Sequence, residues 1–182
     1  DKVGITAPSI AGQAAVLTAA LRAAGLTAEQ IDAVEAHGTG TAMGDPIELA
    51  ALNRAYGPDL AAAGRRCRLG AVKGHVGHLD AAAGMAGLVK ILLALRHGRW
   101  PGTLHFAAPN PAARFGPFEV SAAASDWPRD PARPRRAGLS AFGIGGTNAH
   151  LIVAEPPLAP ALPAEMAAQI LPLSARTPAA LE

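Results

Sequence analysis

The sequence of 182 residues is long enough for one sizeable hydrophobic core, or for a large piece of a bigger one. Its net charge of +2 is too mild to indicate nucleic-acid binding. Charged residues make up only 16% of the chain, against roughly 25% in an average soluble domain. This shortage of charge predicts that a partner subunit, or the rest of a longer polypeptide, covers part of the surface.

No targeting or membrane segment is visible in the sequence. The chain begins DKVGITAPS, without the pattern of a signal peptide, and its longest apolar stretch, residues 81–95, is short for a bilayer and contains Lys90. The single cysteine, Cys67, excludes an internal disulfide framework and fits a reducing compartment. We therefore expect a cytoplasmic protein that binds no membrane. The missing initiator methionine suggests a fragment.

The first elements in chain order are a helix and a strand. Apolar residues recur at helical spacing over residues 12–24, and Gly25 is a suitable C-cap. A capping-box pattern from Thr27 to Gln30 follows. The short apolar run over residues 31–36 then predicts a buried strand.

The middle of the chain predicts two more helices and a second strand. Asp45 as N-cap and Pro46 at the first helical position predict a helix of about three turns that ends at Gly57. The run at 69–73 predicts a strand. A long helix over about 80–96 has small residues on its first turns, and we expect it to be buried against the sheet.

The last elements are two strands, at 137–142 and 149–154, joined by a glycine-dense turn. Strands that alternate with helices and then pair predict an α/β fold, with helices covering a mixed sheet. The composition then changes to PPLAPALPAEM, which is typical of a linker. We therefore divide the chain into a domain over 1–155 and a linker over 156–182, in which a new unit begins.

The glycine-rich stretches do not favour a dinucleotide site. GTGTAM has Met43 at the third position of the G-x-G-x-x-G fingerprint, and GIGGTN has Asn148 there. The second stretch also precedes a strand rather than a helix.

The histidines leave a metal site and an acid–base site as alternatives. His75, His78 and Asp80 lie close in sequence, but a lone His-x-x-His with one carboxylate is a weak metal signal. The acid–base alternative is favoured because a further histidine, His37, follows a buried strand and enters the hydroxyl-rich GTGT. Side chains at a strand end are well placed to face a cleft.

Three stretches together carry a resemblance to a known family. VEAHGTGTAMGDPIELAAL, GAVKGHVGHLDAAAGMAGLVKILLAL and SAFGIGGTNAHLIV occur in this order and spacing. They resemble the C-terminal half of a β-ketoacyl synthase (ketosynthase) domain of a modular type I polyketide synthase. The resemblance covers about residues 1–155, and the tail resembles the start of the linker between ketosynthase and acyltransferase. It implies the C-terminal half of a thiolase-like α/β fold.

The resemblance implies roles for five side chains. In this family two histidines assist decarboxylation of a malonyl-type extender, whose enolate then attacks an acyl-cysteine. By motif match these histidines are His37 and His78, each donating a hydrogen bond from a neutral Nε2–H to the thioester oxygen. Lys73 matches the family's lysine and is expected to anchor a network with Asp45 and Glu48.

The same resemblance implies binding groups for the substrate. The backbone N–H of Ile144 matches a donor to the acyl oxyanion, and its glycine neighbours allow a close approach of the backbone. The implied phosphopantetheine and substrate contacts are Thr39, Thr41, Phe142, Gly143 and Gly145.

The chain departs from the family pattern in two ways. Gly74 and His75 stand where the family often has serine and asparagine, so we interpret His75 as a variation in the loop and not as a third catalytic residue. No stretch resembles the TACSS-type motif of the nucleophilic cysteine, and Cys67 lies in the wrong place. Its three arginine neighbours could lower its thiol pKa, or it is simply a cysteine before a strand.

These departures imply that the chain alone does not catalyse condensation. The expected partners are the N-terminal half of the ketosynthase, an acyl carrier protein, an adjacent acyltransferase and a second copy of the synthase. No resident cofactor or metal is expected, because the substrate is carried on the phosphopantetheine of the carrier. A non-catalytic half-domain kept for docking or assembly is the alternative.

The remaining polar residues are given simpler interpretations. We expect His150 to be structural on a strand, and His97 and His105 to lie in loops. The arginine-rich stretch 129–136 predicts either a solvated loop or a contact for an acidic carrier protein.

Overall fold

The fold is a computed structural model that describes residues 8–157, 176, 177 and 179. Most of the predicted second unit, over 156–182, lies outside the described residues, so the boundary at 155 stays a prediction. The helices are α1 (Ile10–Ala24), α2 (Gly44–Ala62), α3 (Lys73–Val76) and α4 (Ala83–His97), with short 3₁₀ turns η1 (Ala28–Gln30) and η2 (Asp80–Ala82). The strands are β1 (Ala33–Glu35), β2 (Cys67–Gly70), β3 (Arg99–Trp100), β4 (Phe118–Val120), β5 (Ser125–Asp126), β6 (Arg136–Phe142) and β7 (Asn148–Ala154).

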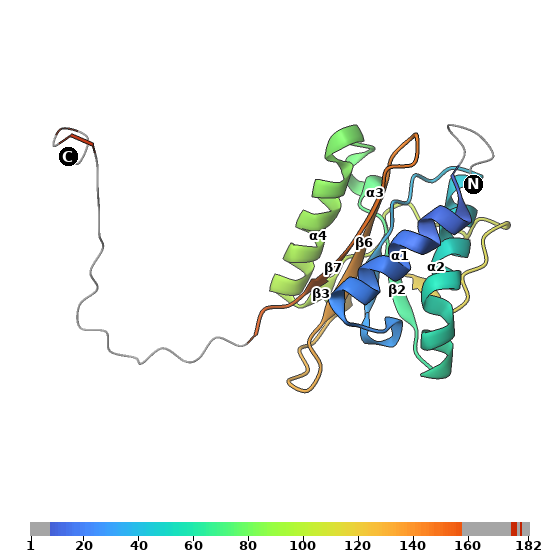
Figure 1. Ribbon diagram of the computed structural model, residues 1–182, viewed down its shortest axis with the longest axis horizontal. Helices are drawn as coiled ribbons and strands as arrows, with labels where there is room; N and C mark the ends of the chain where they lie inside the picture. Colours follow the sequence, from blue (N-terminus) through green and yellow to red (C-terminus); the bar gives the residue numbers. More distant parts are fainter. Residues whose placement is uncertain (1–7, 158–175, 178, 180–182) are drawn as a thin grey trace.

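One five-stranded mixed sheet forms the centre of the molecule, in the order β4-β2-β1-β6-β7. The first four strands run parallel to one another, and β7 is antiparallel to β6. Figure 1 shows α1 and α2 together on one side of the sheet and α4 on the other. The predicted mixed α/β architecture is therefore confirmed.

Residue alternation along β1 divides the core into two layers. Val34 packs in the cluster shared with α1 and α2, whereas Ala33 packs in the cluster shared with α4. Successive side chains of a strand point to opposite faces of a sheet, so a strand buried on both faces shows a continuous apolar run rather than alternation. This explains why so short a strand is recognisable in the sequence.

The prediction for helix α2 was wrong at both ends. The helix begins at Gly44 and runs through Gly57 to Ala62. Asp45 is not its N-cap, because the carboxylate accepts a hydrogen bond from the Gly40 backbone N–H at 3.1 Å. A glycine inside a helix costs about 1 kcal/mol, but the fully buried Tyr56 and Leu60 hold the last turns against the core.

The second strand also differs from its prediction. It covers Cys67–Gly70 and ends before the predicted 69–73 run is complete, so that Lys73 begins the short helix α3. The reason lies at Val72, whose N–H donates to the Glu35 carboxylate and not to a neighbouring strand. The edge strand β4 escaped prediction because only Phe118 of its three residues is buried, so that it has no continuous apolar run.

Helix α4 and the two final strands agree with the predictions more closely. The strands β6 and β7 pair residue by residue from Arg136–Ala154 to Phe142–Asn148 in one sheet. Helix α4 packs one face against the sheet through residues such as Ile91 and Leu95. Its outer face is apolar and exposed, with side chains 48–61% accessible at Met85, Val89, Leu92 and Leu93. Burial of α4 is therefore confirmed for one face only.

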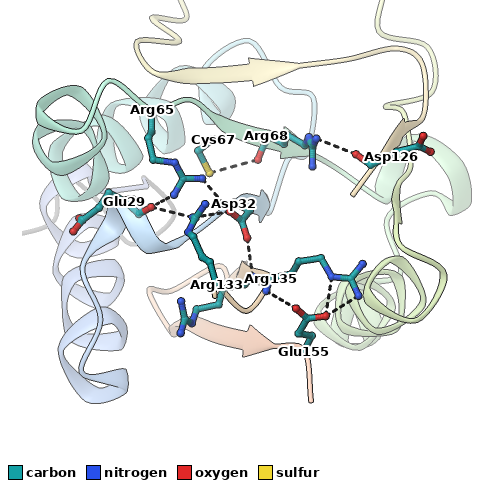
Figure 2. Close-up of polar contacts among 10 residues, drawn as sticks. Glu29, Asp32, Arg65, Cys67, Arg68, Asp126, Arg133, Arg135 and Glu155 are labelled. Atoms are coloured by element: carbon teal, nitrogen blue, oxygen red, sulfur yellow. Dashed lines mark hydrogen bonds and ion pairs between the residues drawn. The ribbon is translucent and has the colours of Figure 1, made fainter. Parts of the chain in front are cut away.

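The arginine-rich stretch 129–136 is exposed over most of its length, as expected for a solvated loop, but three of its four arginines form ion pairs. Figure 2 shows Arg133 beside Asp32 and Arg135 beside Glu155. Asp32 binds Arg65 and Arg133 at 3.0 and 2.7 Å, and Glu155 binds Arg129 and Arg135 at 2.6 and 2.8 Å. These arginine side chains are therefore paired with carboxylates of the same chain.

None of the helices in the described part of the chain is both long and apolar enough to cross a bilayer.

Candidate active site

The predicted site residues lie where three neighbouring parallel strands end. His37 follows β1, Lys73 and His78 follow β2, and Phe142 is the last residue of β6. Because β2, β1 and β6 are adjacent and parallel, their carboxyl ends meet at one edge of the sheet. This edge is the usual position of a site in an open α/β sheet.

The two histidines stand next to each other with matching hydrogen-bond polarity. Their ring centroids are 5.8 Å apart and the rings are nearly perpendicular, at 84°. His37 Nδ1 accepts from the Phe142 N–H at 3.3 Å, and His78 Nδ1 accepts from the Asp80 N–H at 3.0 Å. A neutral imidazole that accepts at Nδ1 carries its proton at Nε2. Both rings therefore present an Nε2–H donor.

The environment of His37 keeps its ring neutral. Burial, together with the positive charge of Lys73 and the neighbouring His78, lowers the pKa of His37 to about 4. At neutral pH the ring is consequently a hydrogen-bond donor without a net charge. The Phe142 ring, 5.8 Å from that of His37, closes one side of it.

The segment that carries His37 is held by side chains from α2 and α3. The Glu48 carboxylate accepts from the N–H groups of His37 and Gly38 at 2.8 and 2.9 Å. Asp45 holds Gly40 in the same way, and Lys73 Nζ donates to the His37 carbonyl oxygen at 2.5 Å. The backbone is thus fixed on both sides of the histidine.

The predicted network therefore takes a different form. We expected Lys73 to join Asp45 and Glu48, but within residues 8–157 it forms no direct ion pair with either, and the three side chains meet through the backbone around His37. Burial raises the pKa of Glu48 to about 7, against the opposing effect of its two backbone hydrogen bonds. Burial also raises the pKa of Asp45 and lowers that of Lys73.

The two threonines of GTGT lie beside each other at the start of α2. Their hydroxyls are 3.4 Å apart, and Thr41 also accepts from the Gly44 N–H at 3.0 Å. A cavity of about 540 Å³ borders this segment. Ala36, Gly38, Gly40 and Ala42 line it, whereas the intervening His37, Thr39 and Thr41 do not. The cavity is therefore not the predicted histidine cleft.

The turn between β6 and β7 contains the remaining predicted residues. Gly143 N–H donates to the Thr147 carbonyl at 2.8 Å, which closes the turn. Gly145 has φ of +93°, a backbone conformation that favours glycine. Ile144 is 89% exposed at the tip. Its backbone role stays a prediction.

The comparisons with known proteins give the family. The profile described as "Beta-ketoacyl synthase, C-terminal domain" matches residues 1–107. The chain belongs to the β-ketoacyl synthase family. The profile of the ketoacyl-synthetase C-terminal extension matches residues 109–182. These ketosynthase profiles meet near residue 108, inside the part of the chain that builds the sheet.

Similar proteins are polyketide synthases and their ketosynthases. The chain is 47% identical to mycoketide-CoA synthase of Mycobacterium tuberculosis, covering 98% of this chain and 4% of that protein. It is 51% identical to erythronolide synthase EryA3 of Saccharopolyspora erythraea, over 85% of this chain and 5% of that protein. Ketosynthase twelve of the bacillaene polyketide synthase from Bacillus amyloliquefaciens superposes with a TM-score of 0.80 at 42% identity, over 88% of this chain and 28% of that one. This ketosynthase sequence therefore has the predicted thiolase-like fold and spans a small part of its relatives.

Other polar residues of this ketosynthase chain are now placed. His75 is exposed on α3. A side chain at Gly74 would approach the Leu104 carbonyl oxygen to 2.9 Å, which explains the lack of a serine there. Across the described ranges, no group of three histidine, cysteine or acidic side chains could hold a metal ion.

One expectation about a single residue needs correction, and two are confirmed. His97 is the last residue of α4 and not a loop residue. Cys67 is a buried structural cysteine at the start of β2, because burial raises the pKa of its thiol instead of the arginines lowering it. His150 is structural as expected, because its ring nitrogens contact Ser140 Oγ at 3.0 Å and Tyr56 OH at 2.7 Å.

Sequence reasoning missed one charged pair next to the site. Glu35 is the last residue of β1 and Lys90 lies in the middle of α4, and their side chains form a buried ion pair. The available signal was a charged residue inside each of two apolar runs, since such residues are rarely buried unless they are paired.

Proposed function

We propose that this chain supplies the two-histidine half of a polyketide synthase ketosynthase. The reaction is the decarboxylative condensation of a malonyl-type extender, carried by an acyl carrier protein, with an acyl group held on a cysteine. The supporting observation is the pair of adjacent imidazoles, in the segments that follow strands β1 and β2, that both accept at Nδ1 and so present Nε2–H.

The proposed chemistry uses these donors where negative charge develops. The bond between the extender's α-carbon and its carboxylate breaks, CO₂ leaves, and the electron pair spreads onto the thioester oxygen. His37 and His78 donate hydrogen bonds to that oxygen. The α-carbon then attacks the acyl-cysteine carbonyl, and the cysteine thiolate leaves. This attack places negative charge on the oxygen of the acyl-cysteine carbonyl, and we assign the Ile144 N–H as a hydrogen-bond donor to that oxygen.

Other site residues hold or guide these groups. Lys73, Glu48 and Asp45 fix the backbone that carries His37. Thr39 and Thr41 are assigned to the phosphopantetheine arm, together with the turn at Phe142, Gly143 and Gly145. No resident metal or cofactor is required by this chemistry, because the carrier protein brings the substrate.

The outer face of α4 supports a partner. A helix that is apolar on all sides is normally buried, and the face with Met85, Val89, Leu92 and Leu93 is exposed here. We assign this face to the N-terminal half of the ketosynthase, which would also carry the nucleophilic cysteine. The acyl carrier protein, an adjacent acyltransferase and a second copy of the synthase complete the proposed assembly.

The test uses a ketosynthase reconstituted from this chain and a matching N-terminal half. His37→Ala and His78→Ala should each slow extender decarboxylation and condensation by about 10²–10³, the usual effect of removing one oxyanion donor. Acylation of the cysteine should change far less, since that step uses backbone donors. Decarboxylation is measured as CO₂ release from the carrier-bound extender.

The matched control is His75→Asn, which changes an exposed histidine three residues before His78. It should change turnover little. Unchanged decarboxylation in both alanine variants would overturn the proposal and favour a half-domain kept for docking. Loss of activity in His75→Asn, with bound zinc in the unmutated protein, would favour the metal alternative.

A further inference from the structure

A buried ion pair lies directly beneath the candidate site. Lys90 Nζ is 2.6 Å from Glu35 Oε2, and the two side chains are 7% and 0% exposed. Removing two charges from water costs several kcal/mol per ion, and apolar replacements of such pairs are often as stable or more so. Stability is therefore a weak explanation for this pair, and its position beneath the site calls for a different role.

The Glu35 carboxylate connects the two segments that carry the histidines. Its Oε2 atom binds Lys90 of α4, and its Oε1 atom accepts from the Val72 N–H at 2.5 Å. Glu35 ends β1, two residues before His37, whereas Val72 immediately precedes Lys73 in the segment that leads to His78. One carboxylate thus fixes the spacing between the end of β1 and the start of α3.

The surroundings of the ion pair are closely packed. A side chain at Gly70 would approach Lys90 Nζ to 2.8 Å, and one at Gly87 would approach Glu35 Cγ to 3.2 Å. The Trp100 ring centroid lies 5.1 Å from the ammonium, within range of a cation–π interaction. The two glycines and the tryptophan therefore form a tight slot around the pair.

We propose that Glu35 and Lys90 are positioning residues for the decarboxylation step, holding His37 and His78 at the separation that lets both donate to one oxygen. This inference rests on the proposed function. The two residues set the separation of the histidines and do not bind the extender, so we expect their loss to lower kcat at nearly constant KM. Misplacing a reacting group by about 1 Å can cost on the order of 10²-fold in rate.

The test compares single and double variants in the reconstituted ketosynthase. Glu35→Gln keeps the size of the side chain but leaves the Lys90 ammonium without its carboxylate. We expect kcat for decarboxylation to fall about 10- to 100-fold, KM for the carrier-bound extender to stay within about twofold, and cysteine acylation to be nearly unchanged.

The double variant E35L/K90M separates positioning from stability. Removing both charges should restore the denaturant midpoint to near that of the unmutated protein, while decarboxylation stays low because Val72 has lost its acceptor. The control is the exposed pair Arg66–Glu119, whose side chains are 61% and 49% accessible. R66M/E119Q should change neither the denaturant midpoint nor the rate of decarboxylation.

Two results would overturn the inference. One is a folded Glu35→Gln variant with normal decarboxylation, and the other is recovery of decarboxylation together with stability in E35L/K90M. His78→Ala in the same preparation distinguishes the two proposals. If His78→Ala abolishes decarboxylation and Glu35→Gln does not, the positioning role alone fails. If neither His37→Ala nor His78→Ala has an effect, the proposed function fails.

Discussion

The two ends of the central sheet are both rich in polar side chains, but they use them differently. At the amino ends of β1, β2 and β6, charged groups pair with one another, as Asp32 does with Arg65 and Arg133 (Figure 2). At the carboxyl ends, Glu48 and Asp45 bind backbone N–H groups, and Glu35 binds both a backbone N–H and the Lys90 ammonium. Across residues 8–157, no hydrogen bond is found at Nε2 of His37 or His78.

This difference separates a structural cluster from a candidate site. Where every charge has an opposite charge beside it, the groups are satisfied by the fold and offer little to a ligand. Where carboxylates hold the backbone and leave imidazole donors open, the fold has fixed groups that a substrate oxygen can still reach. A count of polar residues alone would have favoured the amino end, with its arginines, over the carboxyl end as the candidate site.

The largest expected effect at the amino end is on stability. Asp32→Asn would weaken two ion pairs and a hydrogen bond from the Arg136 N–H. Because these groups are partly exposed, we expect a loss of about 2–3 kcal/mol in the free energy of unfolding. Denaturant titration measures this, and decarboxylation per folded molecule should stay within about twofold. A selective loss of decarboxylation would remove the distinction between the two ends.

At the carboxyl end, Glu48 should make stability depend on pH. Its pKa is raised from 4.5 to about 7 in the fold, so the folded state holds the proton more tightly than the unfolded state. The contribution is therefore fully present below about pH 4.5 and is lost as pH rises through 7. Relative to Glu48→Gln, the unmutated protein should lose about 2 kcal/mol of unfolding free energy between pH 5 and pH 8. Parallel curves for the two proteins would show that Glu48 is charged throughout.

The smallest expected effect concerns Thr41, which accepts from the Gly44 N–H at the start of α2. Thr41→Ala should lower the free energy of unfolding by about 0.5–1 kcal/mol, as for the loss of a helix cap. Thr41→Ser keeps the hydroxyl and should retain most of that stability. Equal losses in the two variants would assign the effect to the methyl group. Thermal unfolding of both proteins decides between them.

The sequence predicted the elements whose signals were long and local. The two seven-residue strands β6 and β7 flank a glycine-dense turn, and both were found in one sheet. The end of α2 was misplaced because Gly57 and Pro58 are strong local stop signals, and only the tertiary burial of Tyr56 and Leu60 overrides them.

The site was predicted in part, and for a different reason. Periodicity placed His37 after a strand, but the pairing of His37 with His78 came from the family resemblance. The bond from the Phe142 N–H that fixes the His37 tautomer depends on how strands β6 and β1 lie together, whereas the bond from the Asp80 N–H to His78 lies within one loop. The Glu35–Lys90 pair joins residues 55 positions apart, so the local pattern indicates that each charge needs a partner but not that the two residues pair with each other.

The clamp around Glu155 has a practical consequence for building chimeric synthases. Glu155 follows β7 and accepts hydrogen bonds from Arg129 and from the backbone and side chain of Arg135. Because β7 runs antiparallel to β6, this clamp lies at the opposite end of the sheet from the histidines. A splice point after Pro156 leaves every one of these contacts inside the same parent, whereas a splice between Arg135 and Glu155 divides them between two parents. Junctions of the first kind should give folded hybrids more often.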